Sequence, residues 1–176
     1  MSHPRPFLPM LALCSVALFA CRGEERRPPG GGAPAATVHG GGPREVEGDC
    51  ETIFNNYNIG AVLNNAASPT FTIAEEDPNI LCYIDTYHWN NARGARPVGT
   101  IGLQPLNGQV LGPWQALGSP GQGGVQNAAW RATPPQPAVQ LRPDTYSVID
   151  SNPPTWSHNN QSRAFGFAKV WVRHGH

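Results

Sequence analysis

Two polar segments carry side chains that are typical of sugar-binding surfaces. The first reads HWNN at residues 88–91, and the second reads WSHNN at residues 156–160. An indole ring can stack on the apolar face of a pyranose, while neighbouring amides and imidazoles bond its hydroxyl groups. The competing interpretations are that the tryptophans cap a domain whose core has few other large side chains, and that the loops are alike by chance. Our hypothetical ligand-binding set consists of Trp89, Asn90, Asn91, Trp114, Trp156, His158 and Asn159.

Catalytic chemistry has little support by comparison. The serines near glycine form no GxSxG turn, and the chain has no HExxH motif. GQGG at residues 121–124 lacks the GK[ST] of a phosphate-binding loop, so we interpret it as a turn. No two carboxylates stand out as an acid–base pair, although folding could bring Asp85, His88 and Asp150 together. The sequence therefore predicts a protein that is not an enzyme and uses no cofactor.

A calcium site is a minor hypothesis. Ca²⁺ prefers oxygen ligands, and suitable side chains occur at Asp85, Asn90, Asn91, Asp150 and Asn152, without EF-hand spacing. Asp150 has a simpler explanation, because an Asp shortly before a proline commonly bonds the backbone of its own turn. We therefore expect no metal site.

The start of the chain has the pattern of an export signal. His3 and Arg5 precede the apolar run FLPMLALCSVALFA, which has signal-peptide length and is too short to cross a bilayer as a helix. The run ends in LFAC at residues 18–21, which resembles the bacterial lipoprotein box, where a peptidase cuts before a lipid-modified cysteine. We expect residues 1–20 to be a lipoprotein signal peptide and Cys21 to carry acyl chains.

Two other interpretations of this signal fit less well. An ordinary signal-peptidase site would need a small residue in place of Leu18, and an uncleaved anchor would be short and interrupted by Pro9. Acyl chains contribute about 0.8 kcal/mol per buried methylene, so several chains on one cysteine hold a soluble domain at a membrane. The expected location is the cell envelope, lipid-anchored and either periplasmic or surface-exposed.

The rest of the chain divides into a tether and one folded domain. Residues 21–48 are rich in Gly, Pro and charge, and such a segment cannot offset the entropy of ordering itself. We expect a disordered tether there and a single domain over residues 49–176. Cys50 and Cys82 fall in this domain, and an even pair in an exported protein is expected to oxidise. The disulfide should connect the first strand to the third or fourth.

The domain is expected to be all-β. About nine or ten short β-branched and aromatic runs, separated by Gly, Pro and Asn, predict an antiparallel β-sandwich or jelly roll with one disulfide. Asn107-Gly108 is the strongest hairpin signal. Residues 80–89 alternate, with Ile80, Cys82 and Ile84 on one predicted face and Leu81 and Tyr83 on the other, and residues 164–173 alternate in the same way. The pattern leaves open which face of each strand is the core. The runs are CETIF, IGAVL, TFTIA, NILCYIDTYHW, VGTIGLQ, QVLGPWQAL, GGVQNAAWRA, AVQLR, TYSVID and FGFAKVWVR.

Three segments resemble a recurrent module of uncharacterised exported bacterial proteins. They are YHWNNARGARPVGTIGL, GPWQALGSPGQGGVQNAAW and IDSNPPTWSHNNQSRAFGF, where the module reads roughly YHWNxGxGxxPGTIxL, GPWxAxGxxGQGGVxNAxW and YxViDSxPxTWSxNxxSxGxGF. The resemblance spans about residues 52–172. Ala92 and Ala95 stand near positions where the module has glycine, and Arg163 and Ala164 replace small residues. The module has no established activity, so the resemblance implies one extracytoplasmic domain and no chemistry.

The charge pattern completes the functional expectation. The net charge is zero, which gives no argument for nucleic acid or a charged polymer as partner. Acids dominate between Glu24 and Asn91 and bases dominate from Arg93 onward, which indicates mutual neutralisation first and a polar binding face second.

The sequence predicts a membrane-anchored, non-catalytic binding domain for carbohydrate or a cell-wall polymer. Its partners would be the membrane, through the lipid, and a glycan or an envelope protein. A structural or protein–protein interaction module is the alternative, and a polymer hydrolase is the second alternative.

Overall fold

The structure is a computed structural model that describes residues 49–74 and 79–175. The predicted signal peptide, the lipidation site at Cys21 and the tether over residues 21–48 lie outside the described residues and stay predictions. No helix within the described ranges is long and apolar enough to span a membrane. The elements are β1 (Glu51–Asn55), β2 (Thr70–Ile73), β3 (Asn79–Tyr87), β4 (Thr100–Pro105), β5 (Leu111–Ser119), η1 (Gln122–Gly124), β6 (Ala129–Ala132), β7 (Gln140–Leu141), β8 (Asp144–Asp150), η2 (Pro153–Thr155) and β9 (Ala168–His174).

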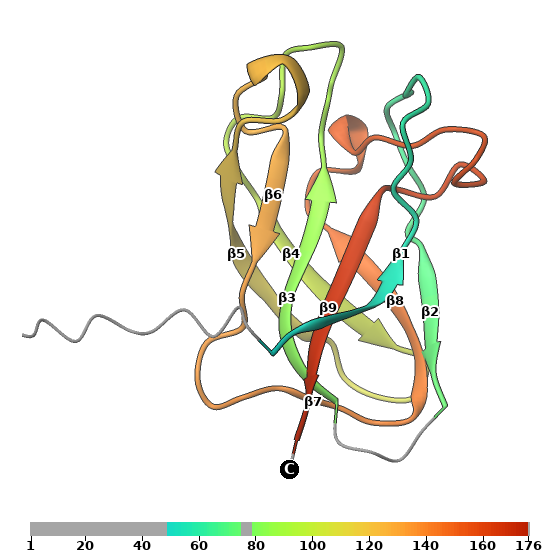
Figure 1. The fold of residues 1–176 in the computed structure, drawn as a ribbon, viewed down its shortest axis with the longest axis vertical. Helices are drawn as coiled ribbons and strands as arrows, with labels where there is room; N and C mark the ends of the chain where they lie inside the picture. The colour runs from blue at the N-terminus through green and yellow to red at the C-terminus, as the bar shows by residue number, and fades with distance from the viewer. Residues whose placement is uncertain (1–48, 75–78, 176) are drawn as a thin grey trace, which may run out of the picture. The chain divides into compact units, whose positions relative to one another are not determined.

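The strands form one antiparallel sheet that is nearly closed into a barrel (Figure 1). Its order is β1-β9-β3-β6-β5-β4-β8-β2, and β7 pairs with β3. Strand β5 joins the two halves, because its first part pairs with β4 and its last part pairs with β6. Phe54 of β1 stacks on Phe71 of β2 at 5.5 Å between ring centroids, so the two ends of the sheet lie close. The prediction of an antiparallel all-β domain with one disulfide is confirmed.

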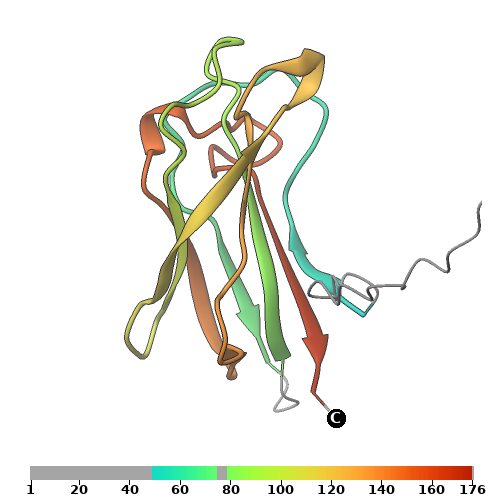
Figure 2. The same ribbon diagram turned by 90° about the vertical axis from the view of Figure 1, so that its left-hand side faces the viewer.

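The core lies between the two sides of this sheet, which Figure 2 shows edge-on. Strand β9 contributes Ala168, Val170 and Val172, all fully buried, while Lys169 and Trp171 alternate with them on the outer face. Burying a valine side chain contributes about 1.5 kcal/mol or more, so small and β-branched residues suffice to hold β9 in place. The structure therefore decides what the alternation left open: the bulky, charged face of β9 is the outer one.

A bulge in β3 changes the alternation that the sequence predicted. Leu81 pairs with Val172 and Tyr83 pairs with Trp171, so Cys82 is the extra residue. As a result Leu81 and Ile84 face the core, while Cys82 and Tyr83 both lie on the partly exposed side. The prediction that places Cys82 and Ile84 on one face is wrong, because a bulge shifts the faces by one residue.

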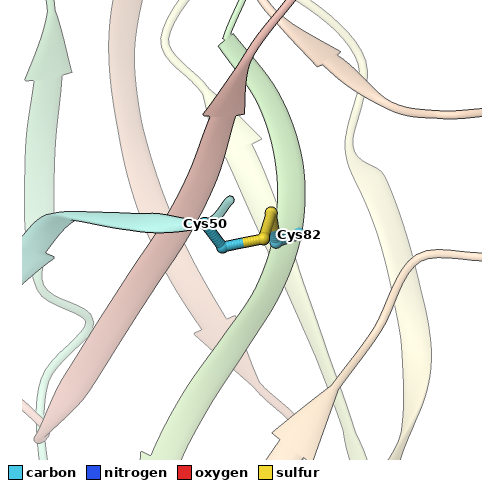
Figure 3. Close-up of a disulfide and its surroundings, with 2 residues drawn as sticks. All are labelled: Cys50 and Cys82. Carbon is cyan, nitrogen blue, oxygen red and sulfur yellow. A yellow bond between two sulfur atoms is a disulfide. The ribbon is translucent and has the colours of Figure 1, made fainter. Parts of the chain in front are cut away.

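The predicted disulfide joins Cys50, just before β1, to Cys82 at this bulge. Figure 3 shows the two side chains meeting. Strand β9 lies between β1 and β3 in the sheet, so the bridge connects two strands that are not hydrogen-bonded neighbours. The expected link between the first and third strands is confirmed.

Strands β4 and β5 form the hairpin predicted around Asn107-Gly108. Its loop spans residues 106–110 and is longer than the two-residue turn that this dipeptide favours. Asn107 donates from its backbone and its side chain to the Asp144 carboxylate, at 3.0 and 3.3 Å. Asn107-Gly108 therefore correctly predicts the position of the hairpin. The loop is longer than a two-residue turn, and Asn107 in it is held by Asp144 of β8.

Four loops gather at one end of the sheet, the upper end in Figure 1. They cover residues 56–69, 88–99, 120–128 and 151–167. Within this group the HWNN and WSHNN segments lie side by side, because Ser157 N donates to Tyr87 O at 2.8 Å and Trp89 N donates to Ser157 Oγ at 2.8 Å.

Candidate functional site

The loop end contains a cleft of about 630 Å³, which we call the loop-end cleft. It is lined by the segment 57–62 together with Tyr87, Trp89, Gln122 and Phe167. The sequence predicted a strand within this segment, over IGAVL, but it forms an irregular loop with an isolated bridge at Leu63. The cleft combines aromatic rings with side-chain amides, which are the groups that a sugar-binding surface requires.

The aromatic rings of the cleft hold one another in place. Tyr57 stacks on Phe167 at 5.6 Å and meets the edge of Tyr87 at 6.2 Å. The Tyr87 hydroxyl accepts a hydrogen bond from Gln122 N at 3.0 Å, which attaches η1 to β3. The Lys169 ammonium lies 4.7 Å from the centroid of the Tyr57 ring, a cation–π distance. These contacts preorganise the rings before any ligand arrives.

Burial, reinforced by the nearby Asp85 and Tyr87, raises the pKa of the Tyr57 phenol well above its ordinary value of 10.0. Tyr57 therefore stays neutral at physiological pH, and its hydroxyl remains a hydrogen-bond donor as well as an acceptor.

The opposite wall of the cleft is held by a reciprocal amide pair. Asn58 Nδ2 donates to Asn159 Oδ1 at 3.0 Å, and Asn159 Nδ2 donates back to Asn58 Oδ1. Asn58 Oδ1 also accepts from Gly60 N at 3.1 Å, which turns the segment at that point. Ile59, next to Asn58, is fully exposed at the rim.

Trp89 lines the cleft, and the turn after it orients the neighbouring amides. Asn90, Asn91 and Ala92 all have positive φ, so the chain makes a left-handed turn there. Asn90 donates from Nδ2 to Gly94 O at 2.7 Å, which closes the turn. Asn91 is exposed beside it. In the HWNN segment, Trp89 therefore lines the cleft, whereas the Asn90 side chain stabilises its own loop.

In the WSHNN segment, Trp156 is buried next to a residue that lines the cleft. Trp156 is 1% exposed, and its indole donates to Phe167 O at 2.9 Å. A side chain at Gly166 would collide with the Trp156 ring, so the ring occupies the space that glycine leaves. The prediction that Trp156 stacks on a ligand is therefore wrong, because the core encloses its ring.

The other polar residues of that segment also have structural partners. His158 Nε2 bonds Asn64 O at 3.1 Å, and Leu63 bridges to His158 through the backbone. Asn159 is buried, and besides Asn58 it binds Ser162. Burial and these bonds remove Asn159 from the predicted ligand-facing set, which is a second correction.

Trp114 lies on β5, opposite Ile101 of β4, and packs half-buried against the core. It does not line the loop-end cleft. Of the three tryptophans in the hypothetical ligand-binding set, Trp89 alone lines the cleft.

His88 and Asp150 meet as the sequence analysis allowed, in a fully buried network. His88 Nε2 lies 3.1 Å from Asp150 Oδ2, and neither side chain is exposed. Because a carboxylate only accepts, Nε2 carries a proton, and Nδ1 lies 2.9 Å from the Thr155 hydroxyl oxygen. Thr86 Oγ1 donates to the same Asp150 oxygen at 3.0 Å. Trp130 stacks on the imidazole at 3.8 Å between ring centroids.

This network ties β3, β8 and η2 together beneath the loops. The order of carboxylate, imidazole and hydroxyl resembles an acyl-transfer relay. Thr155, however, does not line the loop-end cleft, so its hydroxyl does not face the proposed ligand site. Asp85 is elsewhere, bonding Arg131 Nε at 2.8 Å on the outer face. In the described part of the chain, no three His, Cys, Asp or Glu side chains cluster as a metal site.

A second hollow of about 370 Å³ lies on the outer face of the sheet, and we call it the outer hollow. Tyr83, Leu117, Arg131 and Arg173 line it, together with the Cys50–Cys82 disulfide. Leu117 is 78% exposed, an unusual position for a leucine in a strand. Arg131 lies over the Tyr83 ring at 3.9 Å.

The chain matches no protein-family model, no curated protein and no solved structure.

Sequence reasoning missed several cleft residues: Tyr57, Asn58, Tyr87, Gln122 and Phe167. The NNYN run at residues 55–58 could have indicated them. Like HWNN and WSHNN, it places an aromatic ring beside side-chain amides at the end of a predicted strand.

Proposed function

We propose that this domain is a non-catalytic carbohydrate-binding module and that the loop-end cleft is its ligand site. The observation that carries the proposal is the meeting of Tyr57, Tyr87 and Trp89 with the amides of Asn58 and Gln122 around one open cleft. Aromatic rings supply apolar area for the face of a pyranose, and amides supply donors and acceptors for its hydroxyls.

Preorganisation favours binding through this cleft. The Tyr57–Phe167–Tyr87 cluster and the Asn58–Asn159 pair fix both walls, so little conformational entropy is lost when a ligand is bound. Together with the expected lipid anchor, the proposal describes an envelope protein that carries a glycan-binding cleft.

A glycan array followed by calorimetry on the bound oligosaccharide tests this proposal. Trp89→Ala should weaken binding about tenfold, since an aromatic contact contributes up to about 1.5 kcal/mol. Gln122→Ala, at an exposed position in η1, should weaken it without a change in thermal stability.

The matched control is Trp114→Ala, which removes an equally large half-buried ring outside the cleft. Affinity should then stay within about twofold of the unmodified protein, a difference smaller than one hydrogen bond. Equal losses in the Trp89 and Trp114 variants would contradict the cleft as the site. If no glycan binds at all, the interaction-module alternative replaces this proposal.

A polymer hydrolase is the second candidate, and the contact between Thr155 Oγ1 and His88 Nδ1 is what favours it. Release of reducing ends from a polysaccharide, abolished by Thr155→Val with the fold intact, would promote this candidate over a binding module.

A further inference from the structure

The outer face of β3, β6 and β9 carries aromatic and cationic side chains from the loop-end cleft to the outer hollow. Tyr83 packs against Trp171 at 5.3 Å between ring centroids. Arg131 lies over Tyr83, and Lys169 lies over Tyr57 at the edge of the cleft. These side chains point outward because their strand neighbours, such as Ile84 and Val170, are buried in the core.

The two hollows belong to one surface. Strand β3 contributes Tyr87 to the loop-end cleft and Tyr83 to the outer hollow, on the same face of the strand. At about 3.3 Å per residue, these two tyrosines lie about 13 Å apart. A ligand that occupied both hollows would therefore be an extended chain longer than a single sugar.

The charge of this surface differs from the zero net charge of the whole protein. On β3, β6 and β9 its outward side chains include three cations, Arg131, Lys169 and Arg173, and one acid, Asp85. Asp85 bonds Arg131, at 2.8 and 3.2 Å. At the far end of β9, His174 pairs with Glu51 of β1. The outward side chains of these three strands are therefore positive on balance, with Asp85 opposite Lys169 in the sheet.

We propose that the ligand is an acidic polysaccharide that runs from the loop-end cleft along this outer face to the outer hollow. This inference rests on the proposed function and names its ligand class. Sugar rings would contact Trp89, Tyr87 and Tyr83, while carboxylates would meet Lys169 and the guanidinium of Arg173. Arginine suits this role because its fork matches a carboxylate with two parallel hydrogen bonds.

Binding to polygalacturonate and to the neutral polymer dextran, measured by affinity electrophoresis and calorimetry, tests the inference. Polygalacturonate should bind about tenfold more tightly than dextran, and added salt should reduce that difference. Arg173→Gln and Lys169→Gln should each weaken polygalacturonate binding by about threefold to tenfold. Arg173→Gln, which removes a charge from the outer hollow alone, should leave any neutral oligosaccharide that binds through Trp89 unaffected.

Arg163→Gln is the matched control, since it removes one positive charge from an exposed residue that lines neither hollow. An equal loss in this variant would overturn the inference, because only net charge would then matter. Equal affinity for acidic and neutral polymers, with dependence on Trp89, would overturn the inference and leave the proposed function intact. Absence of any polysaccharide binding would reject both. Binding of poly-glutamate that depends on Arg173 and Lys169, with no glycan bound, would replace the polysaccharide by an acidic protein partner.

Discussion

Among residues 49–74 and 79–175, seven residues other than glycine have positive φ, and most of them lie in loops around the candidate site. They are Asn65, Asn90, Asn91, Ala92, Asn127, Arg163 and Ala164. Asparagine tolerates this conformation because its short amide can bond the local backbone, whereas alanine has no such compensation. Ala92 and Ala164, with φ of 63° and 64°, therefore carry backbone strain that an asparagine at the same position would relieve in part.

Ala92→Gly and Ala164→Gly should each raise the free energy of unfolding by about 0.5–1 kcal/mol. The left-handed conformation costs an L-residue about 1–2 kcal/mol, and glycine's extra unfolded-state entropy offsets about half of that gain. Urea denaturation measures the effect.

The control for these variants is Ala129→Gly, in the extended strand β6, which should lower the same free energy by a similar amount. A loss of stability in both loop variants would show that the positive φ values at Ala92 and Ala164 cost nothing.

At the scale of the elements, the bulge in β3 and the disulfide act together. The bulge turns Cys82 outward beside Tyr83, where it can reach Cys50 across β9. The bridge therefore secures the first strand of the sheet, for which β9 is the one hydrogen-bonded neighbour among the described strands. It also forms part of the outer hollow, so the same covalent link supports a proposed binding surface.

Reduction of the Cys50–Cys82 bond should lower the free energy of unfolding by about 3–4 kcal/mol. The bond closes a loop with a sequence separation of 32, and the chain-entropy estimate for such a loop gives this size. Denaturation with and without reductant measures it, and a Cys50→Ser, Cys82→Ser double variant should match the reduced protein. Labelling of both thiols in denatured, unreduced protein would contradict the bond.

At the scale of the whole molecule, the folded domain follows a long N-terminal segment that the sequence predicts to begin with an export signal. The acyl chains expected at Cys21 would hold the protein at a membrane, and the predicted tether over residues 21–48 would separate it from the folded domain. Binding to an extended polymer suits such an arrangement, because a tethered domain can adjust its position along a polymer chain.

Cys21→Ala should release the protein from the membrane or block its processing. Without the thiol no acyl chain can be attached, and the buried methylenes that hold the anchor are lost. Fractionation of cells and mass spectrometry of the N-terminus measure this, with Cys14→Ala as the control that should process normally. A Cys21→Ala protein that is cleaved normally and stays in the membrane fraction would contradict the lipoprotein prediction.

The sequence by itself determined the class of fold and the disulfide. Alternating side chains between glycine, proline and asparagine breaks are a local property, so they predicted an antiparallel all-β domain before any contact was known. The pairing of Cys50 with Cys82 followed from there being two cysteines in the folded part of the chain. The prediction for Trp89 also agrees with the structure: Trp89 lies two residues after the end of β3, where the loops gather, and it lines the cleft.

Only the tertiary structure decided which aromatic rings are exposed and where the cleft lies. Trp89 and Trp156 stand in similar polar sequences, yet Trp156 is enclosed because Gly166 and Phe167 close over it. The cleft wall depends on Asn58 meeting Asn159, residues separated by 101 positions in the chain. Burial is set by neighbours from distant segments, and a residue's own type and local pattern do not contain that information.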